Sequence, residues 1–583
     1  MGLLKNKILV EQVPFSDRGS RIMLFKERGG RSLYIKLAER WVRREAQLGS
    51  YRVRAPIISN IQLLDGEGSP LDFAITTYPH KLILQTRCGS FQLAFQDAET
   101  LYISPPPGRV GLSLRAYSAA GATDRRGGHF REGAGGRNIA YTANSPVVEN
   151  SLARLDGSSF LARFLVEARP NSGIILNITP RLGFNRVVLP ADLVLAEVER
   201  RWRDWFQAVP PVEEAYRQQY LYAWWIMRCG LLSPRFYITR EGMTPSKTHY
   251  IGVWQWDAYF HALAYRHLDM RLAEDQLRLL LDHQLDNGMI PDAVHDEGVV
   301  VDLATPVHAA VTKPPLIAWA ALKLYQLSRN RDFLDEIYEP LVRWNAWWFD
   351  LNDDDRDGIV QYNHPFSSGL DDSPLWDQGM PVEAPDLNTY LCVQMDALAR
   401  IAQELWDEKE AQTWREKAQA LVSRLVKHCW DAKAGIFWAT INHQPIPTLT
   451  PFNLYPLWTG RLGRSMARRL VEHLTDHQEF WTDYPIPTVA KCDPKYNPNQ
   501  MWRGPTWVNI NYIFIEALAM NGYLHLAREL RDRTLKLVMG QSDIYEYYHP
   551  ETGERPPKAA PIFGWSAALF IDLAIKRAQG KII

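Results

Sequence analysis

Two adjacent carboxylates, Asp371 and Asp372, lie in a segment whose sequence favours a tight turn, residues 367–376 (SSGLDDSPLW). A glycine before them lets the backbone turn sharply, and a proline after them interrupts regular hydrogen bonding. Trp376 can supply an apolar wall, and a carboxyl group beside such a wall loses solvation, which raises its pKa. A carboxyl group with a raised pKa can act as a general acid near neutral pH. Taken alone, an Asp-Asp pair is more typical of a solvated acidic turn.

A further acid, Glu546, is surrounded by tyrosines in the segment 543–550 (DIYEYYHP). Tyrosine hydroxyl groups can orient a carboxylate by hydrogen bonding; the alternative is a strand edge with aromatic packing. Cleavage of a glycosidic bond needs one carboxyl group to protonate the leaving oxygen and a second carboxylate on the anomeric side. Repulsion between Asp371 and Asp372 would raise one of their pKa values and so favour the first role. The residue pattern alone does not decide which of the two aspartates that is.

An aromatic run, 254–260 (WQWDAYF), opens a predicted helix and contains Trp254, Trp256 and Asp257. Indole rings can stack on the apolar faces of a sugar, while a carboxylate accepts hydrogen bonds from its hydroxyl groups. We therefore predict a sugar platform whose rings are partly exposed in a pocket. The alternative is a carboxylate that is favourable in the first turn of a helix, next to aromatic residues of the core.

Two later segments carry similar groups. The segment 501–511 (MWRGPTWVNIN) combines Trp502 and Arg503 with a proline at a helix start. The segment 563–566 (FGWS) places Trp565 at a tight turn before the last predicted helix. For Arg503, the alternative is an ion pair with a surface acid.

An acidic loop, 353–359 (DDDRDGI), has the pattern of the first half of a calcium-binding loop, with acids at positions one, three and five and glycine at six. The twelfth position, however, is His364 rather than glutamate. We therefore interpret residues 353–357 as a turn between helices and predict no metal site.

The composition is that of a soluble globular protein, with 46% hydrophobic and 23% charged residues. Lysine plus arginine equals aspartate plus glutamate at 66 each, which argues against a nucleic-acid partner because such proteins carry a basic excess. The 21 tryptophans and 25 tyrosines suit both stacking on sugars and a large core. Five scattered cysteines suggest neither a disulfide framework nor a zinc site.

The first residues contain no long apolar stretch of the kind found in signal peptides. Elsewhere, no uninterrupted apolar run reaches the length that spans a membrane. We therefore expect a cytoplasmic protein without a membrane partner, and the sequence does not indicate its oligomeric state.

A chain of 583 residues is too long for one ordinary core, so two domains are expected. Residues 1–185 contain short alternating runs, such as 91–96 (FQLAFQ), between turn residues, which predicts an N-terminal antiparallel β-sandwich. The glycine- and arginine-rich stretch 121–138 is interpreted as a mobile loop. Residues 186–211 are predicted to form a linker helix with one solvated face.

Residues 212–583 are predicted to be almost entirely helical. Several of the predicted helices are bounded by glycine or proline, and helices joined by loops suggest helical hairpins packed in a ring. The unusual residues lie in the loops, and a ring of this kind carries function on the loops of one end. The predicted helices cover residues 212–230, 254–268, 271–286, 306–329, 331–351, 386–407, 409–430, 462–475, 506–522, 524–539 and 565–577.

Together, these segments resemble glycoside hydrolase family 63 and its trehalase-like relatives, which include processing α-glucosidases and mannosylglycerate and glucosylglycerate hydrolases. The resemblance extends from about residue 212 to 577 and implies an (α/α)6 barrel and inversion at the anomeric carbon. It also implies that Asp371 is the acid, that Glu546 is the base, and that Trp256 and Asp257 contact the sugar. The matching segments, in the family order, are 254–260, 368–374 (SGLDDSP), 386–388 (DLN), 502–511, 546–554 (EYYHPETGE) and 563–566.

We therefore predict an inverting, exo-acting α-glycosidase, preferably an α-glucosidase, that hydrolyses a small α-glucoside or the end of an oligosaccharide. A phosphorylase on a similar barrel and a non-catalytic carbohydrate-binding protein are the alternatives, and the presence of both carboxylates disfavours them. The expected partner is an α-linked sugar substrate, with no cofactor and no nucleic acid. The residues predicted to bind the substrate are Trp254, Trp256, Asp257, Gln284, Asp372, Trp376, Trp502, Arg503 and Trp565.

Overall fold

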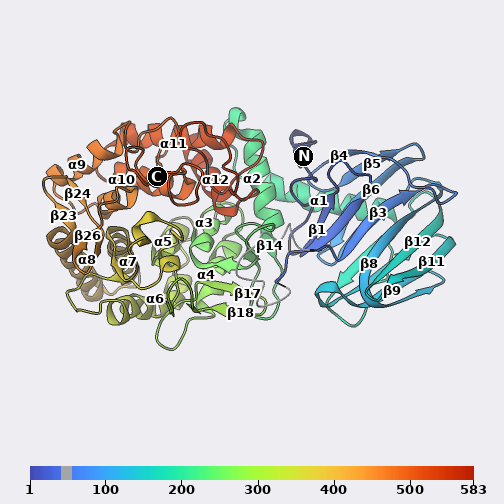
Figure 1. Cartoon of the computed structure of the whole chain (residues 1–583), viewed down its shortest axis with the longest axis horizontal. Coiled ribbons are helices and arrows are strands. Elements are labelled where there is room, and N and C mark those ends of the chain that lie inside the picture. The colour runs from blue at the N-terminus through green and yellow to red at the C-terminus, as the bar shows by residue number, and fades with distance from the viewer. Residues whose placement is uncertain (41–54, 583) are drawn as a thin grey trace. The chain divides into compact units, whose positions relative to one another are not determined.

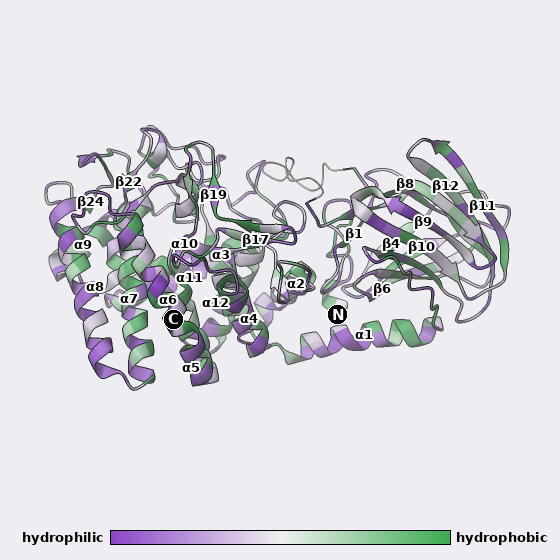
Figure 2. Ribbon diagram, turned by 90° about the horizontal axis from the view of Figure 1, so that it is seen from below, coloured by the Kyte–Doolittle hydropathy of each residue, from purple (hydrophilic) through white to green (hydrophobic). Residues whose placement is uncertain are grey.

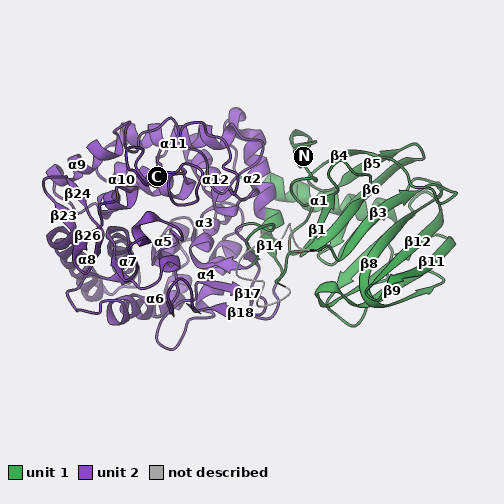
Figure 3. Cartoon of the chain, in the orientation of Figure 1, with its two compact units in different colours: residues 1–209, 228–233, 246–251 green, residues 210–227, 234–245, 252–583 purple. Residues whose placement is uncertain are grey.

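The computed structural model describes residues 1–40 and 55–582 (Figure 1). The chain divides into two compact units (Figure 3), of which the first is rich in strands and the second in helices. The first unit comprises residues 1–209, 228–233 and 246–251, and the second comprises residues 210–227, 234–245 and 252–583.

The first unit is built from antiparallel strands with a buried apolar side. Short alternating runs produce this arrangement because successive side chains of a strand point to opposite faces. The strands are β1 (Ile22–Lys26), β2 (Leu33–Leu37), β3 (Ile58–Leu64), β4 (Ala74–Thr77), β5 (Leu82–Thr86), β6 (Gly89–Asp97), β7 (Thr100–Ser104), β8 (Gly108–Asp124), β9 (Gly127–Gly133), β10 (Arg137–Ala143), β11 (Val147–Asp156), β12 (Ser159–Ala168) and β13 (Ile174–Thr179), preceded by η1 (Gly2–Leu4).

The long strand β8 belongs to both layers of this unit. Its first part, residues 108–117, pairs with β12, while its last part, residues 118–124, pairs with β9. Aromatic side chains fill the space between the layers, and the rings of Tyr141 on β10 and Phe164 on β12 meet edge to face at 5.1 Å. The predicted antiparallel sandwich is confirmed, with one strand that passes from one layer to the other.

The prediction of a mobile loop over residues 121–138 is wrong, because this stretch forms the end of β8, all of β9 and the start of β10. The glycines serve close packing between strands. Gly127 has a φ of 154°, and a Cβ there would collide with the carbonyl group of Tyr141 on the neighbouring strand. A Cβ at Gly128 would collide with the Tyr141 ring. Glycine enrichment here marks crowding rather than mobility.

The first unit ends later than the predicted boundary at residue 185. Helix α1 (Ala191–Ala208), predicted as a linker, belongs to this unit, where Arg201 donates hydrogen bonds to two carbonyl groups of β6 at 2.8 and 2.9 Å. The segment 228–233 also belongs to it, because Arg228 Nε and Asp17 Oδ1 form a buried ion pair at 2.9 Å. A charge pair of this kind was not visible in the hydrophobic pattern on which the predicted boundaries rest.

The second unit contains a closed inner ring, in which each element packs against the next and the last returns to the first. Nearly all residues of these elements are buried, as expected for helices with apolar residues all round. The ring consists, in order, of α3 (Gln255–Tyr265), α5 (Ile317–Ser328), α7 (Pro385–Glu404), η7 (Pro451–Thr459), α10 (Val508–Met520) and α12 (Gly564–Ala578).

Further helices pack against this ring and carry one polar face each, as the purple residues of α8 illustrate in Figure 2. None of the helices within the described residues is long and apolar enough to cross a membrane. These helices are α4 (Met270–Leu281), α6 (Arg331–Leu351), α8 (Glu408–Cys429), α9 (Arg464–Leu474) and α11 (Leu524–Met539), and α2 (Arg217–Gly230) precedes them all.

The predicted ring of helical hairpins is confirmed, with two differences in the helices. The helix predicted over 306–329 begins only at Ile317, because Pro314 and Pro315 cannot continue a helical hydrogen-bond pattern. The ring element η7 was missed, because its prolines at 451 and 456 argue against a helix. It forms a 3₁₀ helix of nine residues that takes one of the positions in the inner ring.

Short strands and turns occupy the connections of the second unit. They include the elements that carry the candidate site described below. Their bounds are β15 (Gly242–Met243), β16 (Val253–Trp254), β17 (Ala293–His295), β18 (Gly298–Val300), β19 (Asp302–Leu303), β20 (Ala309–Ala310), β21 (Gln361–Tyr362), β22 (Val382–Glu383), β23 (Trp430–Asp431), β24 (Ile436–Phe437), β25 (Thr440–Ile441), β26 (Gln444–Pro445), η4 (Glu214–Tyr216), η5 (Pro365–Ser368) and η6 (Pro374–Trp376). The short strand β14 (Leu231–Leu232) belongs to the first unit.

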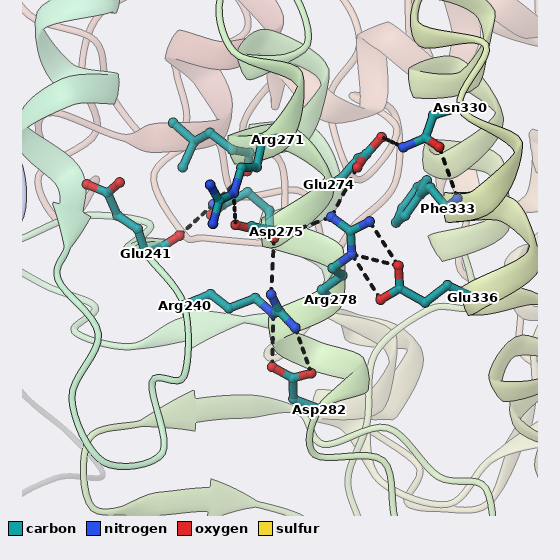
Figure 4. Close-up of polar contacts among 12 residues, drawn as sticks. Arg240, Glu241, Arg271, Glu274, Asp275, Arg278, Asp282, Asn330, Phe333 and Glu336 are labelled. Atoms are coloured by element: carbon teal, nitrogen blue, oxygen red, sulfur yellow. Dashed lines mark hydrogen bonds and ion pairs between the residues drawn. The ribbon is translucent and has the colours of Figure 1, made fainter.

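A polar cluster on α4 ties this helix to α6 (Figure 4). The buried Glu274 pairs with Arg278 at 3.0 Å and accepts a hydrogen bond from Asn330 Nδ2 at 2.9 Å. Arg278 extends the cluster to Glu336 on α6 at 2.9 Å. Glu274 is therefore a buried acid of the second unit that is paired with an arginine, and these contacts join α4 to the start of α6.

Candidate active site

The turn that carries Asp371 is held by its own backbone and by an aromatic ring. η5 ends at Gly369, whose φ of 75° lies in the left-handed region that glycine adopts most readily. Ser368 Oγ accepts a hydrogen bond from the backbone N–H two residues later at 2.9 Å. A Cβ at Gly369 would lie 2.6 Å from the Trp256 ring. The glycine is thus required both by the backbone angle and by the close approach of an indole.

Trp376 fixes the backbone immediately before Asp371. Its indole Nε1 donates a hydrogen bond to the Leu370 carbonyl group at 2.7 Å, and its buried ring meets Tyr362 edge to face at 5.7 Å. Trp376 therefore positions the turn through the polar edge of its ring, and its role as an apolar wall for the substrate remains a prediction.

The two neighbouring aspartates have different surroundings. Asp372 Oδ1 accepts a hydrogen bond from the backbone N–H of Trp502 at 2.8 Å, and its Oδ2 accepts one from Gln500 Nε2 at 3.0 Å. Asp371 Oδ1, by contrast, is buried and has no hydrogen-bond partner within the described part of the chain. The carboxylate of Asp372 is therefore engaged with the Trp502 segment, whereas the Asp371 carboxyl group has one oxygen without a donor.

Burial raises the pKa of Asp371 to about 7, and the negative charges of Asp292 and Asp372 act in the same direction. The Lys313 ammonium opposes this shift without cancelling it. A carboxyl group with such a pKa is protonated for part of the time at neutral pH and can donate its proton. These surroundings favour Asp371 over Asp372 as a proton donor, a choice that the residue pattern left open.

The buried pair Lys313–Asp292 was missed by the sequence reasoning. Lys313 Nζ lies 2.8 Å from Asp292 Oδ1 and donates a hydrogen bond to the Phe366 carbonyl group at 2.5 Å. Both side chains are at least nine-tenths buried. A signal existed, because a lysine next to a proline pair and a long apolar run, 314–322, is rarely an exposed residue.

Asp257 lies in the first turn of α3, as predicted, and its side chain is buried. Burial holds the pKa of this carboxyl well above its usual range, and the charges of Glu546 and Asp292 raise it further, while Lys313 lowers it. The charges of Glu546 and Lys313 both shift the pKa of Asp257, and Lys313 also shifts the pKa of Asp371. The Glu546 segment and the Asp371 segment therefore share one electrostatic environment.

Glu546 is held by the backbone of a neighbouring loop. Its Oε2 accepts a hydrogen bond from the Ala560 N–H at 3.0 Å, and its own N–H donates to the Ala560 carbonyl group at 2.9 Å. Thr506 and Tyr548 exchange two backbone hydrogen bonds at 2.8 and 3.0 Å, which joins this segment to the Trp502 segment. A buried carboxylate with a fixed orientation suits a general base.

Four indoles, those of Trp256, Trp502, Trp507 and Trp565, pack against one another beside these carboxylates. Trp502 and Trp507 stack with centroids 3.7 Å apart and planes 5° from parallel, and Trp256 meets Trp565 edge to face at 5.4 Å. The exposed fractions of Trp256, Trp502 and Trp565 are 2%, 1% and 3%. Trp256 is therefore buried rather than partly exposed as expected for the platform, and sugar contacts by these three tryptophans remain a prediction.

Taken together, the site contains a half-buried, protonatable acid, a buried carboxylate fixed by the backbone, and a buried ammonium–carboxylate pair. One group can give a proton and the other can take one, which is the requirement for general acid and general base catalysis.

Comparisons with known proteins agree with this chemistry. A family model described as the mannosylglycerate hydrolase MGH1-like glycoside hydrolase domain matches residues 250–566, more than half of the chain. A mannosylglycerate hydrolase of Thermus thermophilus is 27% identical over 396 residues, which cover 54% of this chain and 92% of that protein. The chain belongs to glycoside hydrolase family 63. It is therefore a glycosidase, and its substrates are sugars.

Solved structures extend the comparison to the fold of this family 63 hydrolase. The mannosylglycerate hydrolase from a second strain of Thermus thermophilus, in complex with glucose, has a TM-score of 0.53 and 23% identity, and the match covers 61% of this chain and 99% of that one. A bacterial glucoamylase complexed with acarbose has a TM-score of 0.59 and 12% identity over 98% of this chain and 94% of its own. The helical ring is an (α/α)6 barrel, and the second match includes the β-rich unit.

We expect Trp256→Ala to destabilise this hydrolase by about 3–5 kcal/mol, because removal of a buried indole leaves a cavity under Gly369. Denaturant unfolding monitored by circular dichroism measures the loss. Trp406→Ala is the matched control, because this tryptophan is 82% exposed. If both variants unfolded at the same denaturant concentration and only Trp256→Ala raised KM, Trp256 would be a substrate-binding residue and not a core residue.

Two other predicted sugar contacts have protein partners in the family 63 hydrolase. The half-buried Trp254 meets His295 edge to face at 5.1 Å. Arg503 forms an ion pair with Asp377, with one of its two contacts at 3.3 Å. This is the ion pair with a surface acid that was considered as the alternative to a sugar contact. Trp254 lies directly before α3, two residues from the buried Trp256, and stays a candidate sugar contact.

The side-chain amide of Gln284 in the hydrolase is hydrogen-bonded to other protein groups through both its nitrogen and its oxygen. Its Nε2 donates to the carbonyl groups of Gly288 and Pro340 at 2.8 and 2.7 Å, and its Oε1 accepts from Arg343 at 2.8 Å. These contacts hold the turn after α4 against α6. The structure therefore gives this predicted substrate-binding residue a structural role.

The acidic loop of the hydrolase behaves as the predicted turn. Asp353 and Asp357 accept hydrogen bonds from backbone N–H groups of the same loop at 3.1 and 2.7 Å. Ligand atoms of Asp355, Asp357, Glu383 and His443 all lie within 4.8 Å of one another, so these side chains could hold a cation. Asp355 and His443 are exposed and pair at 3.0 Å, as solvated surface groups commonly do.

A separate cavity of about 850 Å³ lies between α6 and α8. Phe349, Trp414, Lys417 and Arg424 are among its lining residues, and none of the predicted site residues lines it. The catalytic chemistry of the hydrolase is therefore assigned to the carboxylate cluster and not to this groove.

Proposed function

We propose that this family 63 hydrolase is an inverting, exo-acting α-glycosidase, and specifically an α-glucosidase that acts on a small α-glucoside or on the end of an oligosaccharide. The observation that carries the proposal is the contrast between its two principal acids. Asp371 is half-buried, with a buried Oδ1 that has no hydrogen-bond partner among the described residues, whereas Glu546 has a carboxylate oxygen fixed by the Ala560 N–H. One is suited to hold a proton and the other to accept one.

The reaction follows from these two states. Asp371 donates its proton to the glycosidic oxygen while the bond from that oxygen to the anomeric carbon breaks. Glu546 accepts a proton from a water molecule, whose oxygen forms the new bond to the anomeric carbon from the opposite face. Asp371 ends as a carboxylate and Glu546 as a carboxylic acid, so a proton must return from Glu546 to Asp371 through solvent before the next cycle.

Similar proteins support the choice of substrate class. The Thermus thermophilus hydrolase structure contains glucose, and the bacterial glucoamylase structure contains acarbose. The carboxylates lie on connections of a closed ring of helices, and a site at the end of such a ring suits the end of a sugar chain better than its middle.

A phosphorylase is less well supported. Such an enzyme needs cationic groups that are available to bind phosphate. The buried cation of this site, Lys313, is already paired with Asp292 at 2.8 Å. Glu546 would also repel a phosphate ion from the position at which it must attack.

The expected stereochemical outcome is that an α-glycoside releases the β-configured sugar first, because the attacking water approaches from the face opposite the leaving group. A panel of α-glucosides and α-mannosides identifies a substrate, and proton NMR in the first minutes, before mutarotation, identifies the anomer. Initial release of the α-anomer would reject inversion and recast Glu546 as a nucleophile. Turnover that depends on phosphate would favour the phosphorylase instead.

A further inference from the structure

Lys313 ties the acid-bearing turn to the segment that carries Asp292. Its ammonium group lies 2.8 Å from Asp292 Oδ1 and donates to the carbonyl group of Phe366 at 2.5 Å. Phe366 belongs to η5, which leads directly into the Asp371 turn. The neighbouring Thr312 donates its backbone N–H to Ser367 Oγ at 3.3 Å. Two consecutive residues therefore hold the same short helix.

The same two segments are also tied to the helix that carries Asp257. Gln255, the first residue of α3, donates its backbone N–H to the Asp292 carbonyl group at 2.9 Å. Its side-chain Oε1 accepts a hydrogen bond from Thr312 Oγ1 at 3.0 Å, and Thr312 Oγ1 also lies 2.6 Å from the Ile290 carbonyl group. All these groups are buried, so the ammonium–carboxylate pair lies within a rigid frame between Asp257 and Asp371.

The charged groups that face Asp371 come from three different segments. Lys313 opposes the protonated form of Asp371, while Asp292 and the adjacent Asp372 favour it. The negative charges of Asp292, Asp371 and Asp257 in turn raise the pKa of Lys313, against the effect of its burial. Of these groups, Asp292 is the one in direct ionic contact with the ammonium. Because of this short distance, the Asp292 charge offsets much of the lowering of the Asp371 pKa that the ammonium would otherwise cause.

We propose that Asp292 is a positioning residue for catalysis: it anchors and neutralises Lys313, and it thereby keeps Asp371 in the protonated form that a general acid needs. The inference rests on the proposed role of Asp371 as the acid. Without its partner, the ammonium would be drawn to the Asp371 carboxylate and would stabilise the charged form of that carboxyl group, which cannot donate a proton.

The first test is the pH dependence of kcat/KM, whose alkaline limb reports the acid of the free enzyme. In Asp292→Asn, this limb should move to lower pH by about 1 unit, since a nearby opposite charge shifts a carboxyl pKa by roughly 1–3 units. In Lys313→Met, the limb should move to higher pH, because the opposing cation is gone. A purely structural role would lower the rate at every pH and leave the limb where it is.

Glu274→Gln is the matched control, because it also removes a buried acid from an acid–cation pair of the same unit (Figure 4). The alkaline limb of its kcat/KM profile should coincide with that of the parent enzyme. An unmoved limb in Asp292→Asn, or shifts of the same sign in both pair variants, would overturn the proposal while leaving the glycosidase function intact. If Asp292→Asn does not fold, Lys313→Met decides alone, and an unmoved limb in that variant overturns the proposal.

A second readout does not depend on activity. The raised pKa of Asp371 contributes stability that is fully present below the unfolded-state pKa of about 4 and is lost as pH rises through about 7. Asp371→Asn does not lose stability in this way. The difference between its Tm and that of the parent should therefore rise from about pH 4 to about pH 7 and then level off. With Asp292→Asn as the parent, the plateau should begin at lower pH. An identical plateau in both backgrounds would refute the role of Asp292, even if no substrate were found.

Discussion

Replacing Asp371 with asparagine is expected to lower kcat/KM by roughly 10²–10⁴-fold on a substrate with a poor leaving group. Asparagine keeps the shape of the side chain in the turn but has no proton to transfer to the glycosidic oxygen. On an activated aryl glycoside the loss should be much smaller, because that leaving group departs without protonation. Steady-state kinetics on an alkyl and a nitrophenyl glycoside of the same sugar measure the difference.

Asp372→Asn separates the two neighbouring acids in the same assay. Asp372 accepts hydrogen bonds from Trp502 and Gln500 and so is engaged in holding the two loops together. We expect a loss that is similar for both leaving groups, since binding geometry rather than protonation is affected. Near-normal turnover of Asp371→Asn on both substrates would remove Asp371 from the acid role, and a leaving-group-dependent loss in Asp372→Asn would transfer the role to Asp372.

The second large effect is expected for Glu546→Gln. Glutamine retains an oxygen that can accept the Ala560 N–H hydrogen bond, but it cannot take a proton from water. Hydrolysis should therefore fall by roughly 10²–10⁴-fold with both leaving groups, because water activation is needed whatever group departs. The two variants thus differ in their dependence on the leaving group, which a general loss of structure would not produce.

Added azide provides a further check on Glu546→Gln. This small anion needs no deprotonation, so it can attack the anomeric carbon from the face that the water normally uses. We expect partial recovery of turnover on an activated α-glycoside and a β-configured glycosyl azide as product, detected by NMR. An α-configured azide would instead indicate that the glutamate had acted as a nucleophile in a retaining mechanism.

The sequence was sufficient to predict the turn at Asp371 and the helices around it, because both depend on local rules. A glycine before an acidic pair and a proline after it restrict the backbone whatever the rest of the chain does. Apolar periodicity likewise marks helices that must bury one face. The choice of Asp371 over Asp372 came from the resemblance, and the structure adds a physical reason: Asp371 Oδ1 is buried without a donor among the described residues, whereas both oxygens of Asp372 accept hydrogen bonds.

Other features could not be predicted, because they depend on what distant segments place beside a residue. The burial of Trp256 depends on Gly369 in the Asp371 turn and on Trp565 in α12, which are distant from it in the sequence. Lys313 acquires its role only when Asp292 and Phe366 reach it. The glycine-rich stretch was misread for the same reason, since composition does not reveal that a neighbouring tyrosine requires the space.

The closure of the inner ring has a consequence for biosynthesis. The last ring helix, α12, packs against the first, α3, and Trp565 meets Trp256 and Phe260 at 5.4 and 6.0 Å. During synthesis, the turn with Asp371 is therefore made long before α12, whose Trp565 packs against Trp256. A deletion from residue 564 onward would spare every carboxylate of the site and still leave the first helix of the ring without its neighbour. The ring thus closes only after α12 has been made and has packed against α3.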